Sequence, residues 1–367
     1  MTAGAFPAAV FMRRALSLAR KGLGRTAPNP AVGAVVVRRG RVVGEGFHRA
    51  AGEPHAEIEA LRAAGEKARG ADLYVTLEPC DHRGRTPPCT AAVIAAGIAR
   101  VAFAMEDPNP RVRGRGARRL REAGLTVHEG LLSDAARELN RGFSRWIVSG
   151  RPHVTLKLAV SLDGQIAASG GASRWISGEA ARRLVHRMRS EADAILVGGG
   201  TARRDDPLLT ARARGGRSPR RVIVTTRPGA IVRNRLFRTG PGEIIVACPA
   251  GIPRREAERL RALGARVLPL HSRGGRFRAA ELLDALGADG VTSLLVEGGG
   301  KTAGWLAAEG AVDRYVLFVA PLLLGDGIRA ISGWACADPQ SGVRLSFRAV
   351  RRVGKDVLLI AEPREGG

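Results

Sequence analysis

The hydrophobic pattern of the first 150 residues alternates between a helical period and short β-branched runs. Apolar residues recur at helical spacing in 9–21, 55–68, 90–96 and 116–123, and they form compact runs in 31–37, 42–47, 73–77 and 100–104. The runs 31–37 and 42–47 flank a basic segment with Gly40, which predicts a hairpin. Helices that alternate with strands favour an α/β sandwich with helices on both faces of a sheet.

The alternation restarts near residue 150 with a buried run at 153–160. The predicted helices are 179–190, 254–263, 279–286 and 302–309, and the further predicted strands are 194–197, 221–225, 243–248, 266–269, 293–296, 314–320 and 357–361. A chain of 367 residues is longer than one hydrophobic core usually serves. We therefore expect two α/β domains, residues 1–148 and 149–367.

The net charge of +25, from 59 basic and 34 acidic residues, raises the question of a polyanionic partner. Only five of the basic residues are lysine, the arginines are spread over both halves, and aromatic residues make up 4%. This distribution favours an arginine-rich surface or small phosphate-bearing ligands, and we expect no nucleic-acid partner.

The sequence contains no apolar run long enough to cross a bilayer, so no membrane partner is expected. Basic residues follow the first apolar stretch, whereas a signal peptide carries them before it. Four cysteines in such a chain argue against a disulfide framework. We expect a cytoplasmic protein with free thiols, in which Cys248 and Cys336 are buried packing residues.

The first chemical motif combines His55, Glu57, Cys80 and Cys89. One histidine and two cysteines are three ligands for a catalytic zinc, which leaves the fourth tetrahedral position to water. Glu57 can then take a proton from that water and deliver it to a leaving amine. His55 and Glu57 converge only if His55 lies in the irregular first turn of its helix, which Pro54 makes plausible. A disulfide or two buried thiols are the alternatives for the cysteines.

The zinc deaminases have a related signature, His-x-Glu followed by Pro-Cys-x-x-Cys. Here Cys80 and Cys89 enclose eight residues in place of two. The order of Pro79, Cys80 and Cys89 after His-x-Glu still favours zinc, and the long loop is an expected place for substrate recognition.

Segments 26–33 (TAPNPAVG), 52–57 (GEPHAE), 75–80 (VTLEPC), 82–89 (HRGRTPPC) and 107–111 (DPNPR) closely resemble the bifunctional deaminase/reductases of riboflavin biosynthesis. The resemblance continues in segments 157–164, 173–177, 194–201 and 205–212 and covers most of the chain. It implies an N-terminal three-layer cytidine-deaminase-like domain with one Zn²⁺, and a C-terminal dihydrofolate-reductase-like α/β domain that uses NADPH.

The same resemblance implies the reaction and the first set of substrate contacts. The family deaminates a phosphoribosylaminopyrimidine, 2,5-diamino-6-(5-phosphoribosylamino)pyrimidin-4(3H)-one, and then reduces its ribose to a ribityl chain. Asn29 is expected to hold the pyrimidine, with His82 and residues 83–86 on the phosphosugar side. The family usually has serine where this chain has Asp81.

In the second half, a strand runs through Gly298–Gly300 into a helix, an arrangement that favours phosphate binding. Neither the Walker A pattern nor G-x-G-x-x-G fits the glycine positions. The resemblance places the NADPH contacts at Ala159, Trp175, Thr201, Asp205, Thr226, Gly299, Gly300, Lys301, Thr302, Ala303, Gly304 and Trp305. It places the substrate contacts at Ser173, Arg189, Leu209, Arg212 and Glu297. Lys157 and Asp205 are the candidate proton donors.

Two other functions remain open at this point. A deaminase of nucleic-acid bases would share the zinc and the glutamate, but it would have no use for a nucleotide-binding second half. A basic nucleic-acid-binding protein with a structural zinc would need a fourth protein ligand, for which His82 is the nearby candidate. We expect the bifunctional enzyme, acting on a small-molecule substrate as a homo-oligomer, either a dimer or a tetramer.

Overall fold

A computed structural model describes residues 8–82, 87–212 and 216–364. The chain divides into two compact units, Met1–Gly150 and Arg151–Gly367. Within the described ranges, no helix has both the length and the apolar character needed to cross a membrane.

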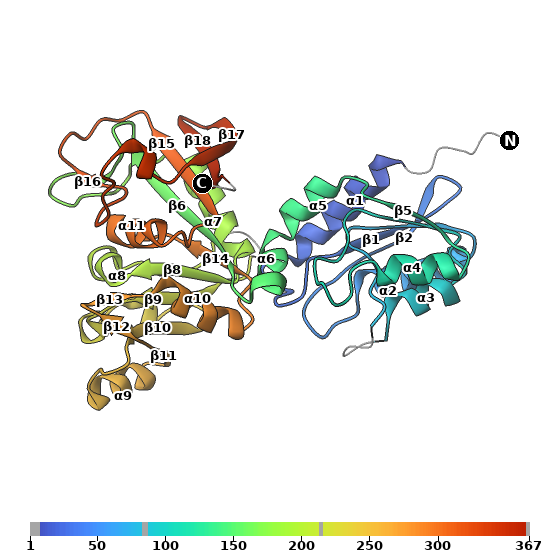
Figure 1. Ribbon diagram of the computed structural model, residues 1–367, viewed down its shortest axis with the longest axis horizontal. Helices are drawn as coiled ribbons and strands as arrows, with labels where there is room; N and C mark the ends of the chain where they lie inside the picture. The colour runs from blue at the N-terminus through green and yellow to red at the C-terminus, as the bar shows by residue number, and fades with distance from the viewer. Residues whose placement is uncertain (1–7, 83–86, 213–215, 365–367) are drawn as a thin grey trace. The chain divides into compact units, whose positions relative to one another are not determined.

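The N-terminal unit is built around one mixed sheet (Figure 1). Its elements are α1 (Ala9–Ala19), η1 (Arg20–Gly22), β1 (Gly33–Arg38), β2 (Arg41–Phe47), α2 (Ala56–Ala64), η2 (Gly65–Ala68), β3 (Asp72–Val75), α3 (Cys89–Ala95), β4 (Arg100–Phe103), α4 (Arg115–Glu122), β5 (Thr126–Glu129), α5 (Ser133–Leu139) and α6 (Arg141–Ser149). In the described residues the strand order is β2-β1-β3-β4-β5, with β3, β4 and β5 parallel and β1 antiparallel to both neighbours. Helices α1 and α5 cover one face, and α2, α3 and α4 cover the other.

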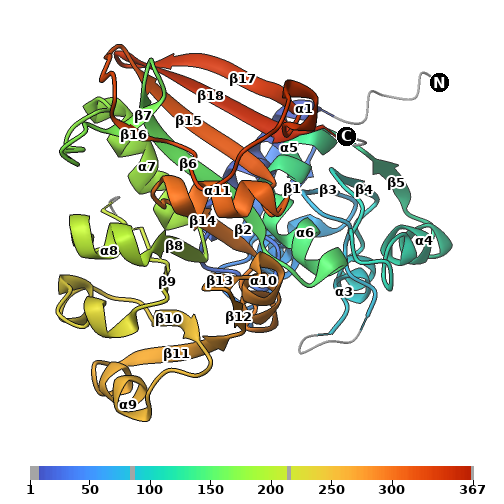
Figure 2. The same ribbon diagram turned by 60° about the vertical axis from the view of Figure 1, so that its left-hand side comes forward.

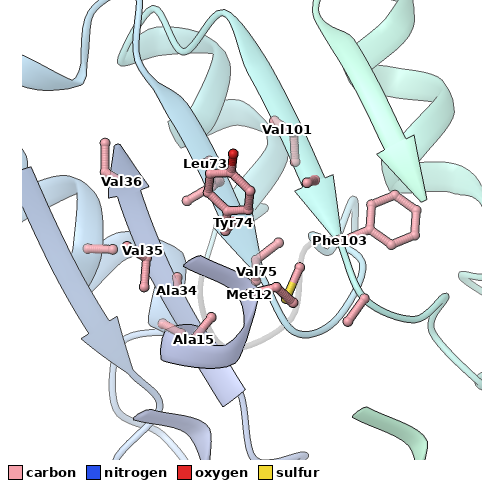
Figure 3. Packing of buried hydrophobic residues seen from close by; sticks show 14 of the residues in the cluster. Met12, Ala15, Ala34, Val35, Val36, Leu73, Tyr74, Val75, Val101 and Phe103 are labelled. Atoms are coloured by element: carbon pink, nitrogen blue, oxygen red, sulfur yellow. The ribbon is translucent and has the colours of Figure 1, made fainter. Parts of the chain in front are cut away.

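The core of this unit lies between these helices and the sheet. Met12 and Ala15 of α1 pack toward β1 and β3, where Val35 and Tyr74 are buried (Figure 3). On the other face, α2 approaches β2 closely because two strand residues are glycines. A Cβ on Gly44 would lie 2.3 Å from the carbonyl oxygen of Ala60. This close contact fixes α2, and with it the residues at its N-terminus.

The C-terminal unit is built on a long, mostly parallel sheet. Its elements are β6 (His153–Ser161), β7 (Gln165–Ala167), α7 (Glu179–Glu191), β8 (Ala194–Gly198), α8 (Gly199–Asp205), β9 (Arg220–Val224), η3 (Pro228–Ile231), η4 (Arg235–Phe237), β10 (Ile244–Pro249), α9 (Arg254–Ala262), β11 (Ala265–Leu270), β12 (Ser272–Arg273), β13 (Arg276–Phe277), α10 (Ala279–Ala288), β14 (Ser293–Val296), α11 (Gly300–Ala308), β15 (Arg314–Ala320), β16 (Ile328–Arg329), η5 (Pro339–Ser341), β17 (Leu345–Val353) and β18 (Asp356–Pro363).

In the described part of the chain this sheet has the order β11-β10-β9-β8-β14-β6-β15-β18-β17, which Figure 2 displays from bottom to top. All neighbouring pairs are parallel except β15 with β18 and β18 with β17. Both faces are covered, as parallel sheets require. Leu196 of β8 joins the core under α10 and α11, whereas its neighbours Ile195 and Val197 join the core on the opposite face.

The α/β fold class is confirmed, and every helix and strand predicted from the sequence is present with small shifts at its ends. The pattern missed β5, α5, α6, the short helix α8 and the edge strand β17, and also the short strands β7, β12, β13 and β16 and the 3₁₀ helices η3, η4 and η5. Cys248 is buried, as expected, but the prediction for Cys336 was wrong, because this side chain is exposed. Cys336 lies in a surface segment between β16 and η5, where no core is available to it.

Candidate functional site

His55, Cys80 and Cys89 come together although they lie on three separate segments. His55 is the N-cap residue of α2 and has an extended backbone, with φ −71° and ψ 161°. Cys80 follows β3, and Cys89 is the first residue of α3. The ligand atoms of the three residues all lie within 4.8 Å of one another. The expected placement of His55 at an irregular helix start is confirmed.

This donor set fits a tetrahedral zinc ion. The Nδ1 atom of His55 lies 3.2 Å from the Sγ of Cys89 and 3.6 Å from the Sγ of Cys80. Typical zinc bonds to nitrogen and sulfur at a tetrahedral angle imply a nitrogen–sulfur separation of about 3.6 Å. A hydrogen bond from Cys89 lowers the pKa of Cys80 to about 4. The three atoms are therefore close to the spacing that a metal ion needs.

Glu57 lies in the first turn of α2, two residues after His55, and is 4% exposed. Burial raises the pKa of Glu57 to about 7, and the nearby Cys80 adds to this effect. A buried carboxyl group beside a metal-binding cluster is the type of group that exchanges protons during catalysis.

The loop that carries Cys80 is held by the carboxylate of Glu78. Glu78 is 3% exposed and accepts hydrogen bonds from three backbone N–H groups, those of Asp107, Gly114 and Ala117, at 3.2, 3.0 and 3.1 Å. At the other end of the loop, the hydroxyl of Thr90 donates to Asp81 over 2.6 Å. The carboxylate of Asp81 thus accepts a hydrogen bond within the loop that joins Cys80 to Cys89.

A cavity of about 420 Å³ opens beside the three predicted zinc ligands, His55, Cys80 and Cys89. Of the predicted site residues, Asn29, His55, Glu57, Cys80 and His82 line it. The prediction for residues 83–86 falls outside the described part of the chain. Lining residues that the sequence analysis did not single out include His48, Asp107, Asn109, Phe143, Trp146 and Ile147.

The apolar wall of the cavity comes from α6, whose Phe143, Trp146 and Ile147 follow helical i, i+3, i+4 spacing. That spacing was the available sequence signal. The helix is short and polar between these positions, so the signal is weak.

His48 fixes the orientation of the Asn29 side chain. The Nδ1 atom of His48 lies 3.1 Å from the carbonyl oxygen of Pro54, and its Nε2 atom lies 3.0 Å from the amide nitrogen of Asn29. A carbonyl only accepts, so Nδ1 carries the proton. Burial lowers the pKa of His48, which favours the neutral ring, and its Nε2 then accepts from Asn29. The carbonyl oxygen of the Asn29 amide is left for the cavity.

The second cluster lies at the carboxyl end of β14 in the C-terminal unit. Glu297 directly follows β14 and accepts two hydrogen bonds from Arg189 of α7, at 2.6 and 3.0 Å. Lys157 on the neighbouring strand β6 lies 3.8 Å from Glu297. Burial lowers the pKa of Lys157. Burial alone would raise the pKa of Glu297, but the charges of Arg189 and Lys157 outweigh it and hold this pKa below its ordinary value.

Two glycine turns lie at the ends of the adjacent strands β8 and β14. A Cβ on Gly198 would lie 2.3 Å from the hydroxyl oxygen of Thr302, so the two turns touch. The backbone N–H of Gly299 donates to the hydroxyl of Thr201 over 3.0 Å. Helix α11 starts at Gly300 with no acidic residue in its first turn. A paired glycine turn at a helix N-terminus suits the phosphates of a dinucleotide.

The other predicted cofactor positions differ in exposure. Trp175 and Thr226 are exposed, and Trp175 packs against the Arg182 guanidinium. Ala303 and Gly304 are buried, and the indole of Trp305 donates to the backbone of Phe277. Ala159 and Asp205 are partly buried. For all of these, cofactor contact stays a prediction.

Among the predicted substrate positions, Leu209 is buried, Ser173 is partly exposed and Arg212 is exposed. Arg189 also donates to the backbone carbonyl of Thr210 over 3.2 Å. The expected contact of Arg189 with a phosphate stays a prediction. In the structure its guanidinium group already donates two hydrogen bonds to Glu297.

Comparison with known proteins finds a matching family for each part of the chain. The family model "RibD C-terminal domain" matches residues 152–359, and "Cytidine and deoxycytidylate deaminase zinc-binding region" matches residues 7–105. "Riboflavin biosynthesis protein RibD" of Escherichia coli (strain K12) is 42% identical, over 95% of this chain and 97% of its own length.

Two solved structures cover nearly the whole chain. Acinetobacter baumannii RibD has a TM-score of 0.86 and 36% identity, over 97% of this chain and 99% of its own. A Thermotoga maritima protein described as a diaminohydroxyphosphoribosylaminopyrimidine deaminase/5-amino-6-(5-phosphoribosylamino)uracil reductase has the same TM-score and identity, over 97% and 98%.

Proposed function

Because the chain belongs to the RibD family of riboflavin biosynthesis, we propose which of its residues carry out the two reactions and on which substrate. It is a bifunctional enzyme, a zinc-dependent deaminase and an NADPH-dependent reductase. The deaminase substrate is 2,5-diamino-6-(5-phosphoribosylamino)pyrimidin-4(3H)-one, and the reductase converts the deaminated ribosyl compound to 5-amino-6-(5-phosphoribitylamino)uracil. The reactions named for the similar Thermotoga maritima protein support this substrate assignment.

For the deamination, His55, Cys80 and Cys89 hold the zinc ion, and the clustering of their ligand atoms is the observation that carries the proposal. When bound, zinc supplies a Lewis acid that makes a water molecule nucleophilic near neutral pH. Glu57 takes a proton and passes it to the leaving amine, because its carboxyl group is buried beside this cluster.

Within the same cavity, Asn29 holds the pyrimidine. The Nε2 atom of His48 accepts a hydrogen bond from the amide NH₂ group of Asn29. The amide oxygen of Asn29 then accepts a hydrogen bond from the pyrimidine. His82 lies toward the phosphosugar, and Phe143 and Trp146 supply apolar surface to the ring.

For the reduction, the paired glycine turns and Lys301 receive the phosphates of NADPH, which supplies the hydride when bound. The remaining cofactor positions are those given by the family resemblance. Lys157 and Glu297 face the ribose of the substrate, with Ser173, Leu209 and Arg212 around it. Arg189 orients Glu297 through its two hydrogen bonds.

We also propose a homo-oligomer that forms through the C-terminal unit. β17 is the last strand of the sheet order, so its outer edge has no strand partner in the described residues. It exposes 69% of Phe347 and 62% of Val350, which is unusual for a free edge strand. A Phe347→Glu variant should sediment as a smaller species than wild type, whereas Val10→Glu, at an exposed position of α1, should not. A zinc site needs Cys80 and Cys89 in reduced form, and both are free cysteines, which favours a reducing compartment, the cytoplasm.

The deaminase assignment is tested by Glu57→Gln, with Glu59→Gln on the same helix as the control. We expect the Glu57 variant to keep about one zinc ion per chain and to lose ammonia release. The Glu59 variant should keep the zinc ion and the ammonia release, because among the described residues Glu59 makes ion pairs only with Arg49 and Arg62. Ammonia release that survives in Glu57→Gln would refute the role of this residue.

A further inference from the structure

His186 lies in the reductase cluster but has no role in the proposed chemistry so far. It is on α7, three residues before Arg189, so the two side chains share one face of the helix. Arg189 uses this face to reach Glu297 at the end of β14. His186 is partly buried at the same place.

One ring nitrogen of His186 is left without a partner. Its Nδ1 atom is buried and has no hydrogen-bond partner in the part of the chain that the structure describes. A buried polar atom of this kind usually marks a place where a ligand or a water molecule completes the hydrogen bonding. Arg189 and Glu297 already bond each other, whereas His186 keeps a buried nitrogen atom available to a ligand.

The charges around His186 come from four groups on different elements: Arg189 on α7 itself, Arg212 on the loop after α8, Lys157 on β6 and Glu297 after β14. Three positive charges and one negative charge give a net local charge of +2. A substrate phosphate dianion would change this sum from +2 to 0. Protonation of His186 is therefore opposed in the free protein and becomes easier when the phosphosugar binds.

The reduction needs an acid at this place. Hydride adds to C1′ of the ribose, the C1′–O4′ bond breaks, and its electron pair moves to O4′, which must take one proton to become a hydroxyl group. The cofactor is oxidised, C1′ is reduced, and the proton balances the reaction.

We propose that the His186 imidazolium is the proton donor to O4′, charged by the binding of the substrate phosphate to the neighbouring Arg212. This inference rests on the proposed placement of the substrate in the reductase cluster. It deepens that proposal by naming the acid and the event that charges it.

The other two candidates fit this task less well. The ammonium group of Lys157 lies 3.8 Å from the Glu297 carboxylate and so already has a charged partner, whereas the Nδ1 atom of His186 has no hydrogen-bond partner among the described residues. Burial raises the pKa of Asp205 at the end of α8, but the charges that act on this carboxyl group are those of Arg174 and Arg204 and not those of the Arg189–Glu297 cluster.

The pH dependence of the wild-type reductase gives a test without any variant. Burial and then the charges of Arg189 and Arg212 lower the pKa of His186 in the free protein. The pKa seen in kcat/KM, which reports the free enzyme, should therefore lie below the ordinary histidine range. The pKa seen in kcat, which reports the substrate complex, should be higher, and kcat should fall as pH rises through it. Equal pKa values in the two profiles would contradict the proposal.

The variant test uses His186→Gln and His186→Asn, with His271→Gln as the matched control. His271 is in the same unit, and its side chain is 91% exposed. With the deaminated substrate, kcat for NADPH oxidation should be about a hundredfold or more lower in both His186 variants. Their kcat should also no longer fall as the pH rises. The His271→Gln control should keep the wild-type kcat and its fall at high pH. His186 variants that retain wild-type kcat would overturn the role as proton donor.

A binding readout is independent of turnover. Calorimetric titration of the zinc-loaded protein with ribose 5-phosphate, in buffers of different ionisation enthalpy, measures protons taken up on binding. Wild type and His271→Gln should take up protons above pH 7, and His186→Gln should not. Equal uptake in all three proteins would contradict the proposal.

The proposed function and the role of His186 fail separately. If the wild-type protein does not oxidise NADPH with the deaminated substrate, the proposed function is wrong. If it does, and His186→Gln is equally fast, only the role of His186 is wrong.

Discussion

Replacement of Glu78 by glutamine is expected to loosen the loop that carries Cys80. The Oε2 atom of Glu78 accepts from the backbone N–H groups of Asp107 and Gly114, and its Oε1 atom accepts from Ala117. Gly114 and Ala117 are the N-cap and third residues of α4. The negative carboxylate therefore lies at the positive end of the helix dipole, where it is stabilising.

The magnitude follows from the number of donors that lose their acceptor. Glutamine offers one carbonyl oxygen, which can keep the two bonds of Oε2, while its NH₂ group faces the N–H of Ala117. One buried N–H group without an acceptor costs about 1–3 kcal/mol, so we expect a loss of about 2 kcal/mol in the free energy of unfolding. For a unit of this size, about 2–4 °C per kcal/mol gives a fall in Tm of about 4–8 °C. Glu78→Ala removes all three bonds and should cost more.

Thermal unfolding of the N-terminal unit, followed together with zinc content, measures this effect. Glu66→Gln is the control, because Glu66 is exposed on η2 and its change should stay within about 0.5 kcal/mol. We expect Glu78→Gln to unfold earlier and to lose zinc faster to a chelator than wild type. A Glu78→Gln protein with the Tm and zinc release of Glu66→Gln would refute this reasoning.

Further predictions concern the core, the second unit and the metal. Phe103→Ala empties a fully buried position and should cost about 3–5 kcal/mol in denaturant unfolding of the N-terminal unit, and a loss below about 1 kcal/mol would contradict the packing. Arg221→Ala removes a buried guanidinium group that donates to four backbone carbonyls between residues 236 and 242. The free energy of unfolding of the C-terminal unit should therefore fall by about 3 kcal/mol or more. Arg220→Ala is the control and should have a smaller effect. Zinc removal by a chelator should stop ammonia release and leave NADPH oxidation by the deaminated substrate unchanged; equal loss of both activities would argue against separate sites.

The metal cluster could be predicted from the sequence because its chemistry restricts the residue types. A histidine and two cysteines in a fixed order, with a glutamate two residues after the histidine, are typical of a zinc site that activates water. The helix and strand context of the motif followed from hydrophobic periodicity. The place of His55 at the start of α2 followed from Pro54 and the need for convergence with Glu57.

Other parts of the site could not be predicted because their contacts join distant segments. Arg189 and Glu297 are 108 positions apart, and no local pattern pairs them. The apolar wall on α6 depends on a helix of nine residues, too short for a clear period. The strand β17 was missed since its residues are mostly exposed and its arginines interrupt the alternation of apolar positions. The role of Glu78 depends on backbone N–H groups, which sequence patterns do not reveal.

The measurement that tests the central claim most directly is a coupled assay on the phosphoribosylaminopyrimidine substrate with separate readouts of ammonia and NADPH. The wild-type, zinc-loaded protein should release one ammonia and oxidise one NADPH per substrate, with ammonia appearing first. Glu57→Gln should do neither on this substrate but should oxidise NADPH at the wild-type rate when given the deaminated intermediate. NADPH oxidation by Glu57→Gln on the original substrate, or failure of the wild type to consume NADPH after ammonia release, would contradict the account.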